Sequence, residues 1–105
     1  MTPAEFIRTI PQRVNPEAIQ DKETCFHFLI TGEEGGEFTI TVKDGQCTER
    51  DGLHDSPKCT YRTSAQVFKD ILAGKKNPTM AYMTGEVKVD NIGEMMKYSK
   101  HFGLI

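Results

Sequence analysis

The sequence predicts an α+β fold in which helices cover one face of a five-stranded, mainly antiparallel sheet. Five short segments carry strand signals. Four of them alternate between apolar and polar residues, as strands of an antiparallel sheet with one buried face do. Other segments combine helix-capping residues with apolar residues at helical spacing. Because the 105 residues contain no linker or repeat, we expect residues 1–105 to form a single domain around one core.

The N-terminal segment predicts a short capped helix. Thr2 and Glu5 have the spacing of a capping box, with proline at the first helical position between them. Pro11 ends this helix near Thr9, since proline disfavours the helical conformation of the residue before it. A further turn is expected from Asn15 to Ile19. The apolar side of the helix consists of Phe6, Ile7 and Ile10.

Strand signals follow this segment. The expected strands are residues 25–31, 37–42, 46–50, 59–63 and 87–89. The first has apolar residues on both sides, so we expect it to be buried on both faces, with His27 as a structural histidine. In the second, Phe38 should face the core and Thr39 should face water. Asp44-Gly45 predicts a type I′ turn into the third strand, because both central residues of that turn need positive φ.

Three further helices are expected, each opened by a capping residue. They start at Thr63, Asn77 and Asn91, and the glycines that follow them are Gly74, Gly85 and Gly103. The first of these helices has an apolar face formed by Val67, Phe68, Ile71 and Leu72. The last has a stripe formed by Ile92, Met95, Met96, Ser99 and Phe102. Leu104 and Ile105 are expected to fold back over the body, since both are too apolar for water.

The composition favours a cytoplasmic globular protein. A formal net charge of −2 provides no field that would attract nucleic acid, and no apolar run approaches the ~20 residues of a membrane span. The N-terminus lacks the basic and apolar regions of a signal peptide, and the C-terminus lacks a peroxisomal address. The three cysteines form an odd set without a CxxC pair, so we expect free thiols.

No residues show the pattern of a catalytic or metal site, and we expect neither enzyme activity nor a cofactor. Gly74-Lys75 lacks the upstream glycine and the hydroxyl residue of a phosphate-binding loop. Glu33-Glu34 is interpreted as a solvated turn rather than a general acid and base. The best candidate for a metal site consists of Cys47, His54 and Cys59, and these residues lack a standard zinc-binding spacing.

The methionines allow two interpretations. Methionines spaced along one face of a helix usually belong to the hydrophobic core. Two pairs on two helices would also form a deformable wall suited to variable apolar ligands, and these are Met80, Met83, Met95 and Met96. Transient contact with an anionic membrane could involve Lys69, Lys75 and Lys76, although lysines at a helix end are usually just solvated.

In order and residues, these elements resemble the sterol carrier protein 2 (SCP2-like) family along nearly the whole chain. The matching pieces are residues 26–32, Gly35-Gly36, Phe38, Ile40, residues 43–45, residues 64–75, Asn77-Pro78, residues 80–85 and residues 87–89. The resemblance implies a mixed sheet with helices on one side, enclosing an apolar tunnel for a fatty acyl chain, acyl-CoA or sterol, and no catalysis. The lack of a peroxisomal address suggests a free-standing microbial member.

The resemblance also implies which residues bind lipid. These are Phe38, Phe68, Ile71, Leu72, Met80, Met83, Met95, Met96 and Phe102. Two departures from the family pattern stand out. Phe38 replaces a tryptophan that many relatives carry, and the Asp90-Asn91 turn is shorter than usual, which affects the angle of the last helix and the depth of the tunnel.

Two functions of different classes follow from these expectations. The first is a non-enzymatic lipid carrier that holds a fatty acyl, acyl-CoA, sterol-like or isoprenoid ligand. Accessory work in isoprenoid quinone synthesis would be a special case of it. The alternative is an accessory interaction module that presents its apolar face to a partner enzyme or to a second copy of itself.

Overall fold

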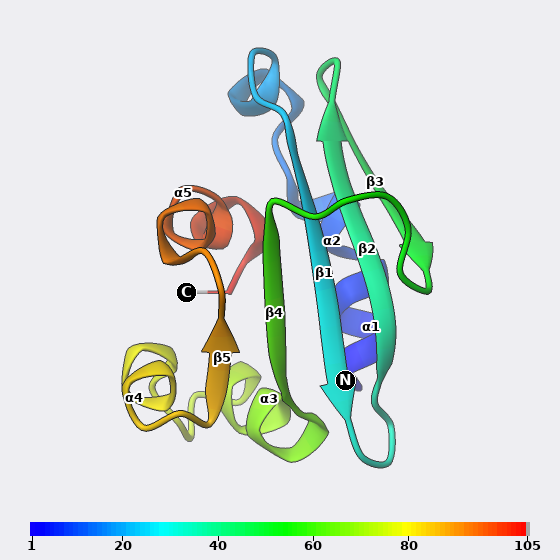
Figure 1. Ribbon diagram of the computed structural model, residues 1–105. Helices are drawn as coiled ribbons and strands as arrows, with labels where there is room; N and C mark the ends of the chain where they lie inside the picture. The colour runs from blue at the N-terminus through cyan, green and yellow to red at the C-terminus, as the bar shows by residue number, and fades with distance from the viewer. Residues whose placement is uncertain (105) are drawn as a thin grey trace.

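One mixed sheet organises the protein in the computed structural model, which describes residues 1–104. β1 pairs antiparallel with β2 and parallel with β4, and the β2–β3 and β4–β5 pairs are antiparallel. The predicted five-stranded, mainly antiparallel sheet is therefore confirmed. Its spatial order is β3-β2-β1-β4-β5 (Figure 1), and the strands are β1 (Thr24–Thr31), β2 (Gly36–Lys43), β3 (Gln46–Asp51), β4 (Cys59–Ser64) and β5 (Val87–Val89).

The helices pack toward the two edges of this sheet. In Figure 1, α1 and α2 lie behind β1 and β2, whereas α4 and α5 lie toward the β5 edge. The helices are α1 (Pro3–Arg8), α2 (Ile10–Arg13), α3 (Ala65–Leu72), α4 (Pro78–Met83) and α5 (Ile92–Phe102), and a 3-10 turn, η1, spans Pro16–Ile19.

An aromatic cluster forms the centre of the core, between the sheet and the helices. The rings of Phe26 and Phe102 meet edge to face at 5.2 Å, and Tyr98 approaches Phe26 at 5.8 Å. Phe68 of α3 meets Tyr61 of β4 edge to face at 6.0 Å. Edge-to-face contacts suit the ring quadrupoles, so this cluster fastens α3 and α5 to adjacent strands.

Two helix boundaries differ from the prediction. α3 begins after Ser64, whose hydroxyl accepts the N–H of Val67 at 3.1 Å, and not after Thr63. Thr63 instead belongs to β4 and donates its hydroxyl to the carbonyl of Glu86 at 2.8 Å. Pro11 follows the end of α1 as expected, but it also lies in the first turn of α2. A proline is tolerated there because its missing N–H would have had no helical partner.

The buried stripe of α5 is rotated relative to the prediction. Met95, Tyr98, Ser99 and Phe102 are buried, and this i, i+3, i+4, i+7 spacing defines one helical face. Ile92 and Met96 were expected on the same stripe but are 41% and 72% exposed. Tyr98 takes the inner position because its ring packs against Phe26 and Phe102.

The connection between β3 and β4, residues 52–58, covers part of the outer sheet face and crosses in front of β1 and β2 (Figure 1). The Thr39 hydroxyl donates to the Gly52 carbonyl at 2.8 Å and accepts the His54 N–H at 2.9 Å. The His54 carbonyl lies 2.7 Å from Nε2 of His27. The expectation that Thr39 faces water is therefore wrong, because this connection buries it. His27 is buried with a hydrogen-bond partner, as expected for a structural histidine.

Candidate functional site

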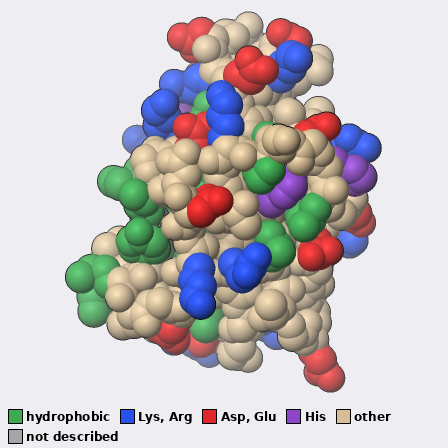
Figure 2. Space-filling model, in the orientation of Figure 1, with side chains coloured by type: hydrophobic (Ala, Val, Ile, Leu, Met, Phe, Trp, Pro, Cys, Tyr) green, Lys and Arg blue, Asp and Glu red, His purple; other side chains and the backbone are tan. Residues whose placement is uncertain are grey.

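An apolar groove of about 340 Å³ lies between α4 and α5. Strands β4 and β5 contribute its floor, and the two helices contribute its walls. The lining side chains are all uncharged: Tyr61, Pro78, Thr79, Tyr82, Met83, Val87, Val89, Ile92, Met95, Met96, Ser99 and Leu104. On the surface, hydrophobic side chains gather at the edge of the molecule where α4 and α5 lie (Figure 2). The groove can therefore shelter apolar matter without burying a protein charge.

Two other hollows differ in character. The larger, of about 630 Å³, is lined by apolar Phe6, Ile71 and Leu72 but also by Arg13 and Lys76. The other, of about 380 Å³, is lined mainly by polar and charged residues: Thr60, Arg62, Lys88, Val89 and Asp90. Although the larger hollow has more volume, the charges on its lining make the groove between α4 and α5 the better site for an apolar ligand.

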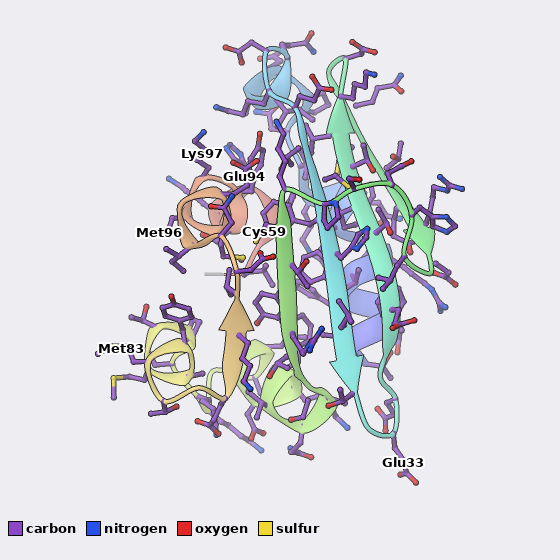
Figure 3. The ribbon with its side chains drawn as sticks, viewed as in Figure 1. Glu33, Cys59, Met83, Glu94, Met96 and Lys97 are labelled. Carbon is purple, nitrogen blue, oxygen red and sulfur yellow. The ribbon has the colours of Figure 1, made fainter. Side chains whose placement is uncertain are left out.

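α4 is held by its caps and by one small side chain. The Asn77 side chain accepts two N–H groups of the first turn, at 2.8 and 3.1 Å, and Gly85 follows the helix with a φ of +83°. Ala81 is the only buried residue of α4. Met80 and Met83 are 56% and 72% exposed, and Figure 3 shows Met83 on the side of α4 away from the sheet. Most of the apolar surface of α4 is therefore available for contact.

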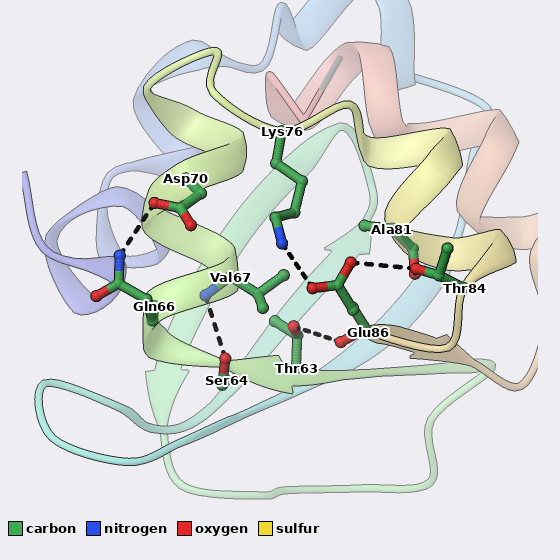
Figure 4. A network of polar contacts seen from close by, with 9 residues as sticks. All are labelled: Thr63, Ser64, Gln66, Val67, Asp70, Lys76, Ala81, Thr84 and Glu86. Atoms are coloured by element: carbon green, nitrogen blue, oxygen red, sulfur yellow. Dashed lines mark hydrogen bonds and ion pairs between the residues drawn. The ribbon is translucent and has the colours of Figure 1, made fainter.

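A polar network joins α4 to the sheet (Figure 4). The Glu86 carboxylate accepts hydrogen bonds from Lys76 at 2.6 Å and from the Thr84 hydroxyl at 3.1 Å. The hydrogen bond from Lys76 lowers the pKa of Glu86, and the same bond raises the pKa of Lys76. Because surface ion pairs add little stability, the main effect of this pair is to fix the turn between α4 and β5.

The start of α5 is tied to distant parts of the chain. The Asn91 side chain accepts the N–H of Glu94 at 3.1 Å and donates to the Lys58 carbonyl at 2.9 Å. The Glu94 carboxylate accepts the hydroxyl of Thr24, which is buried at the start of β1. These bonds set the direction in which α5 leaves the short Asp90-Asn91 turn.

The end of α5 brings Leu104 between the groove and the larger hollow. Gly103 has a φ of +80°, and its N–H donates to the Lys100 carbonyl at 3.3 Å. The Leu104 N–H donates to the Ser99 carbonyl at 2.8 Å, which completes a Schellman motif. Leu104 is consequently buried, as predicted, and it borders both hollows together with Pro78. The same prediction for Ile105 lies outside the described residues.

Four lining residues carry a hydroxyl group, Tyr61, Thr79, Tyr82 and Ser99, and Tyr61 and Ser99 are buried. Ser99 is 5% exposed, and its Oγ has no hydrogen-bond partner within residues 1–104. Tyr61 is also buried, and this burial raises the pKa of its phenol well above the ordinary value. Both hydroxyls are therefore neutral at physiological pH, so the groove offers polar atoms without charge.

The lipid-binding residues implied by the family resemblance fall into three groups. Met83, Met95 and Met96 line the groove. Ile71 and Leu72 line the larger hollow, on the other side of Leu104. The residues that line neither are Phe38, Phe68 and Phe102, which are buried in the core, and Met80, which is exposed on α4. The expected lining residues are thus spread over two hollows, the core and the surface.

Several lining residues were missed by reasoning from the sequence. Tyr61, Val87 and Val89 come from strands, and the alternation of β4 and β5 was the only available signal for them. Tyr61 and Val89 are paired across the two strands, so they share one sheet face. No local pattern indicates that these strands, rather than β2 or β3, lie beneath α4 and α5.

The described residues contain no metal-binding group, and two of the three cysteines are poorly reactive. Within residues 1–104, no three His, Cys, Asp or Glu side chains are grouped so that they could hold a metal ion. Burial raises the pKa of Cys47 to about 11 and that of Cys59 to about 12. Since the thiolate is the reactive form, these two thiols are poor nucleophiles. None of the helices in residues 1–104 has the length and apolar character needed to cross a membrane.

The fold is that of a one-sided α+β domain whose sheet edge and last two helices enclose an apolar groove. The chain belongs to the SCP-2 sterol transfer family, whose sequence pattern matches residues 5–103. This assignment confirms the resemblance seen in the sequence.

Individual relatives place this domain in proteins of different lengths. Hydroxysteroid dehydrogenase-like protein 2 from Xenopus tropicalis is 30% identical over 102 residues, which are 94% of this chain and 24% of that protein. The sec-alkylsulfatase Pisa1 from Pseudomonas sp. matches 100% of this chain with 16% of its own, at a TM-score of 0.74 and 21% identity. Palmitated SCP2L2 from Aedes aegypti matches over 91% of each chain, at a TM-score of 0.71 and 16% identity. This chain therefore spans about a quarter of the curated dehydrogenase-like relative.

Proposed function

We propose that the protein is a non-enzymatic lipid carrier that holds a single-chain apolar ligand in the groove between α4 and α5. The observation that carries this proposal is a groove of about 340 Å³ with an uncharged, mainly apolar lining. Ligand pockets begin at roughly 300 Å³ and combine apolar walls with a few polar atoms. Each methylene group that leaves water for such a groove contributes about 0.8 kcal/mol to binding.

The family supports the same proposal. The family is named for sterol transfer. One similar structure, SCP2L2 from Aedes aegypti, is palmitated. Fatty acyl, acyl-CoA, sterol-like and isoprenoid ligands are the candidates. Because the groove lies near the lower end of ligand-pocket volumes, it suits a single chain better than a fused ring system.

The exposed methionines suit a mouth through which ligands exchange. Met83 on α4 and Met96 on α5 both line the groove, yet each is 72% exposed (Figure 3). Unbranched thioether side chains adapt their shape to what they contact. A chain that enters between these helices would cover apolar surface that is otherwise in water.

The proposal is tested by native mass spectrometry after gentle purification, followed by titration with a fluorescent fatty alcohol. We expect one ligand per chain, and we expect a fatty alcohol to displace the fluorescent probe. A protein that carries no lipid and does not bind the probe would overturn the proposal.

The alternative function, an interaction module, has one observation in its favour. Exposed apolar side chains on α4 and α5 form a patch that extends beyond the groove: Met80, Tyr82, Met83, Ile92 and Met96. Met80 belongs to this patch but does not line the groove. If the patch binds a protein, Met80→Ser should weaken self-association in analytical ultracentrifugation. If the groove binds lipid, Met80→Ser should leave lipid binding unchanged.

A further inference from the structure

Ser99 lines the apolar groove, and its hydroxyl has no hydrogen-bond partner within residues 1–104. Its side chain is 5% exposed. A buried hydroxyl without a partner is unfavourable, and native proteins satisfy nearly all such groups. Serines inside helices often return the hydroxyl to the carbonyl one turn earlier, but Ser99 does not. The hydroxyl is therefore free to meet a bound molecule.

Ser99 lies at the inner end of the groove. Its carbonyl accepts the N–H of Leu104 at 2.8 Å, and Leu104 separates the groove from the larger hollow. Met83 and Met96, each 72% exposed, lie at the outer end. A group that reaches Ser99 from this outer end leaves water between α4 and α5.

The lining restricts the charge of that group. The groove is lined by no lysine, arginine or histidine. A carboxylate or phosphate at the inner end would consequently be buried without a counter-ion, which is costly. A neutral oxygen carries no such cost, and a serine hydroxyl can donate to it or accept from it.

We propose that Ser99 hydrogen-bonds a neutral oxygen, either a hydroxyl or a carbonyl, at the inner end of the ligand. The groove then selects an uncharged single-chain lipid whose hydrocarbon tail runs outward between Met83 and Met96. This inference rests on the proposed lipid-carrier function and specifies the ligand class of the same groove.

The test compares two ligands of equal chain length, 1-octanol and octane supplied from its vapour. Binding to wild type, Ser99→Ala and Ser99→Thr is followed by NMR through the methyl signals of Val87 and Met95. We expect Ser99→Ala to weaken 1-octanol binding about 2- to 13-fold, the range of one neutral hydrogen bond, and to leave octane binding unchanged. Ser99→Thr retains a hydroxyl and should restore the preference for the alcohol. Thermal unfolding verifies that each variant is folded.

The outcomes separate this inference from the function on which it rests. If both ligands bind wild type but Ser99→Ala leaves their affinity ratio unchanged, the role of Ser99 is wrong while the lipid groove stands. If neither ligand shifts the groove signals of wild type, both proposals fail. A selective loss of the alcohol in Ser99→Ala, restored in Ser99→Thr, supports the role of Ser99.

Discussion

Replacing Met83 by tryptophan fills the groove without disturbing the core. Met83 is 72% exposed, so we expect Met83→Trp to unfold within about 0.5 kcal/mol of wild type. The groove measures about 340 Å³, and ligand pockets begin at roughly 300 Å³. An indole ring that occupies more than about 40 Å³ of the groove therefore reduces its free volume below the size of a ligand pocket. If the indole excludes two or three methylene groups of the ligand, the lost burial is about 1.6–2.4 kcal/mol. This corresponds to a roughly 15- to 60-fold rise in Kd.

Isothermal titration calorimetry with 1-dodecanol measures this change. The matched control is Met80→Trp, because Met80 lies on the same helix and is 56% exposed but does not line the groove. An unchanged Kd in Met83→Trp would refute the reasoning, and so would an equal loss of affinity in Met80→Trp. A marked fall in the melting temperature of Met83→Trp would show that Met83 belongs to a packed core instead.

Three further predictions concern Leu104, which borders both hollows, Phe102 in the core, and the pH dependence of stability. Leu104→Ala should cost about 2–5 kcal/mol in urea unfolding and join the two hollows that Leu104 borders. The longer 1-hexadecanol should then gain affinity relative to 1-dodecanol, and an unchanged ratio contradicts this. Phe102→Ala should cost about 3–5 kcal/mol because Phe102 is fully buried against Phe26, and a loss below about 1 kcal/mol would place Phe102 outside the core. Burial and the neighbouring Asp51 raise the pKa of Glu49 to about 7. The folded state therefore binds the extra proton between about pH 4.5 and 7, and stability falls as pH rises through that window. Glu49→Gln should flatten this decline in urea unfolding at several pH values, whereas equal slopes in both proteins contradict it.

The sequence predicted the elements whose signals are local. Asn77 and Gly85 bound α4 as expected, since a cap depends on residues within one turn. Asp44 and Gly45 take φ values of 53° and 76°, as the predicted hairpin turn requires. Strand alternation indicated which residues of β2 face the core, but it could not show that the connection at residues 52–58 buries Thr39.

The candidate site was predicted less completely, because burial depends on partners far away in the chain. Met96 and Tyr98 are close in sequence on one amphipathic helix, and only packing against Phe26 decides that Tyr98 turns inward and Met96 outward. Phe102 likewise belongs to the aromatic core rather than to the groove.

The sequence by itself predicted the five strands and every α-helix except α2 (Ile10–Arg13), because capping, alternation and turn preferences act over a few residues. The order of these elements along the chain then indicated the fold class and the family. Only the tertiary structure decided where the groove lies and what lines it. The groove depends on β4 and β5 passing beneath α4 and α5, and on Leu104 folding back to a place where it borders both hollows. The position of Ser99 on the last helix was predicted from the sequence, but only the packed structure shows that its hydroxyl has no hydrogen-bond partner within residues 1–104.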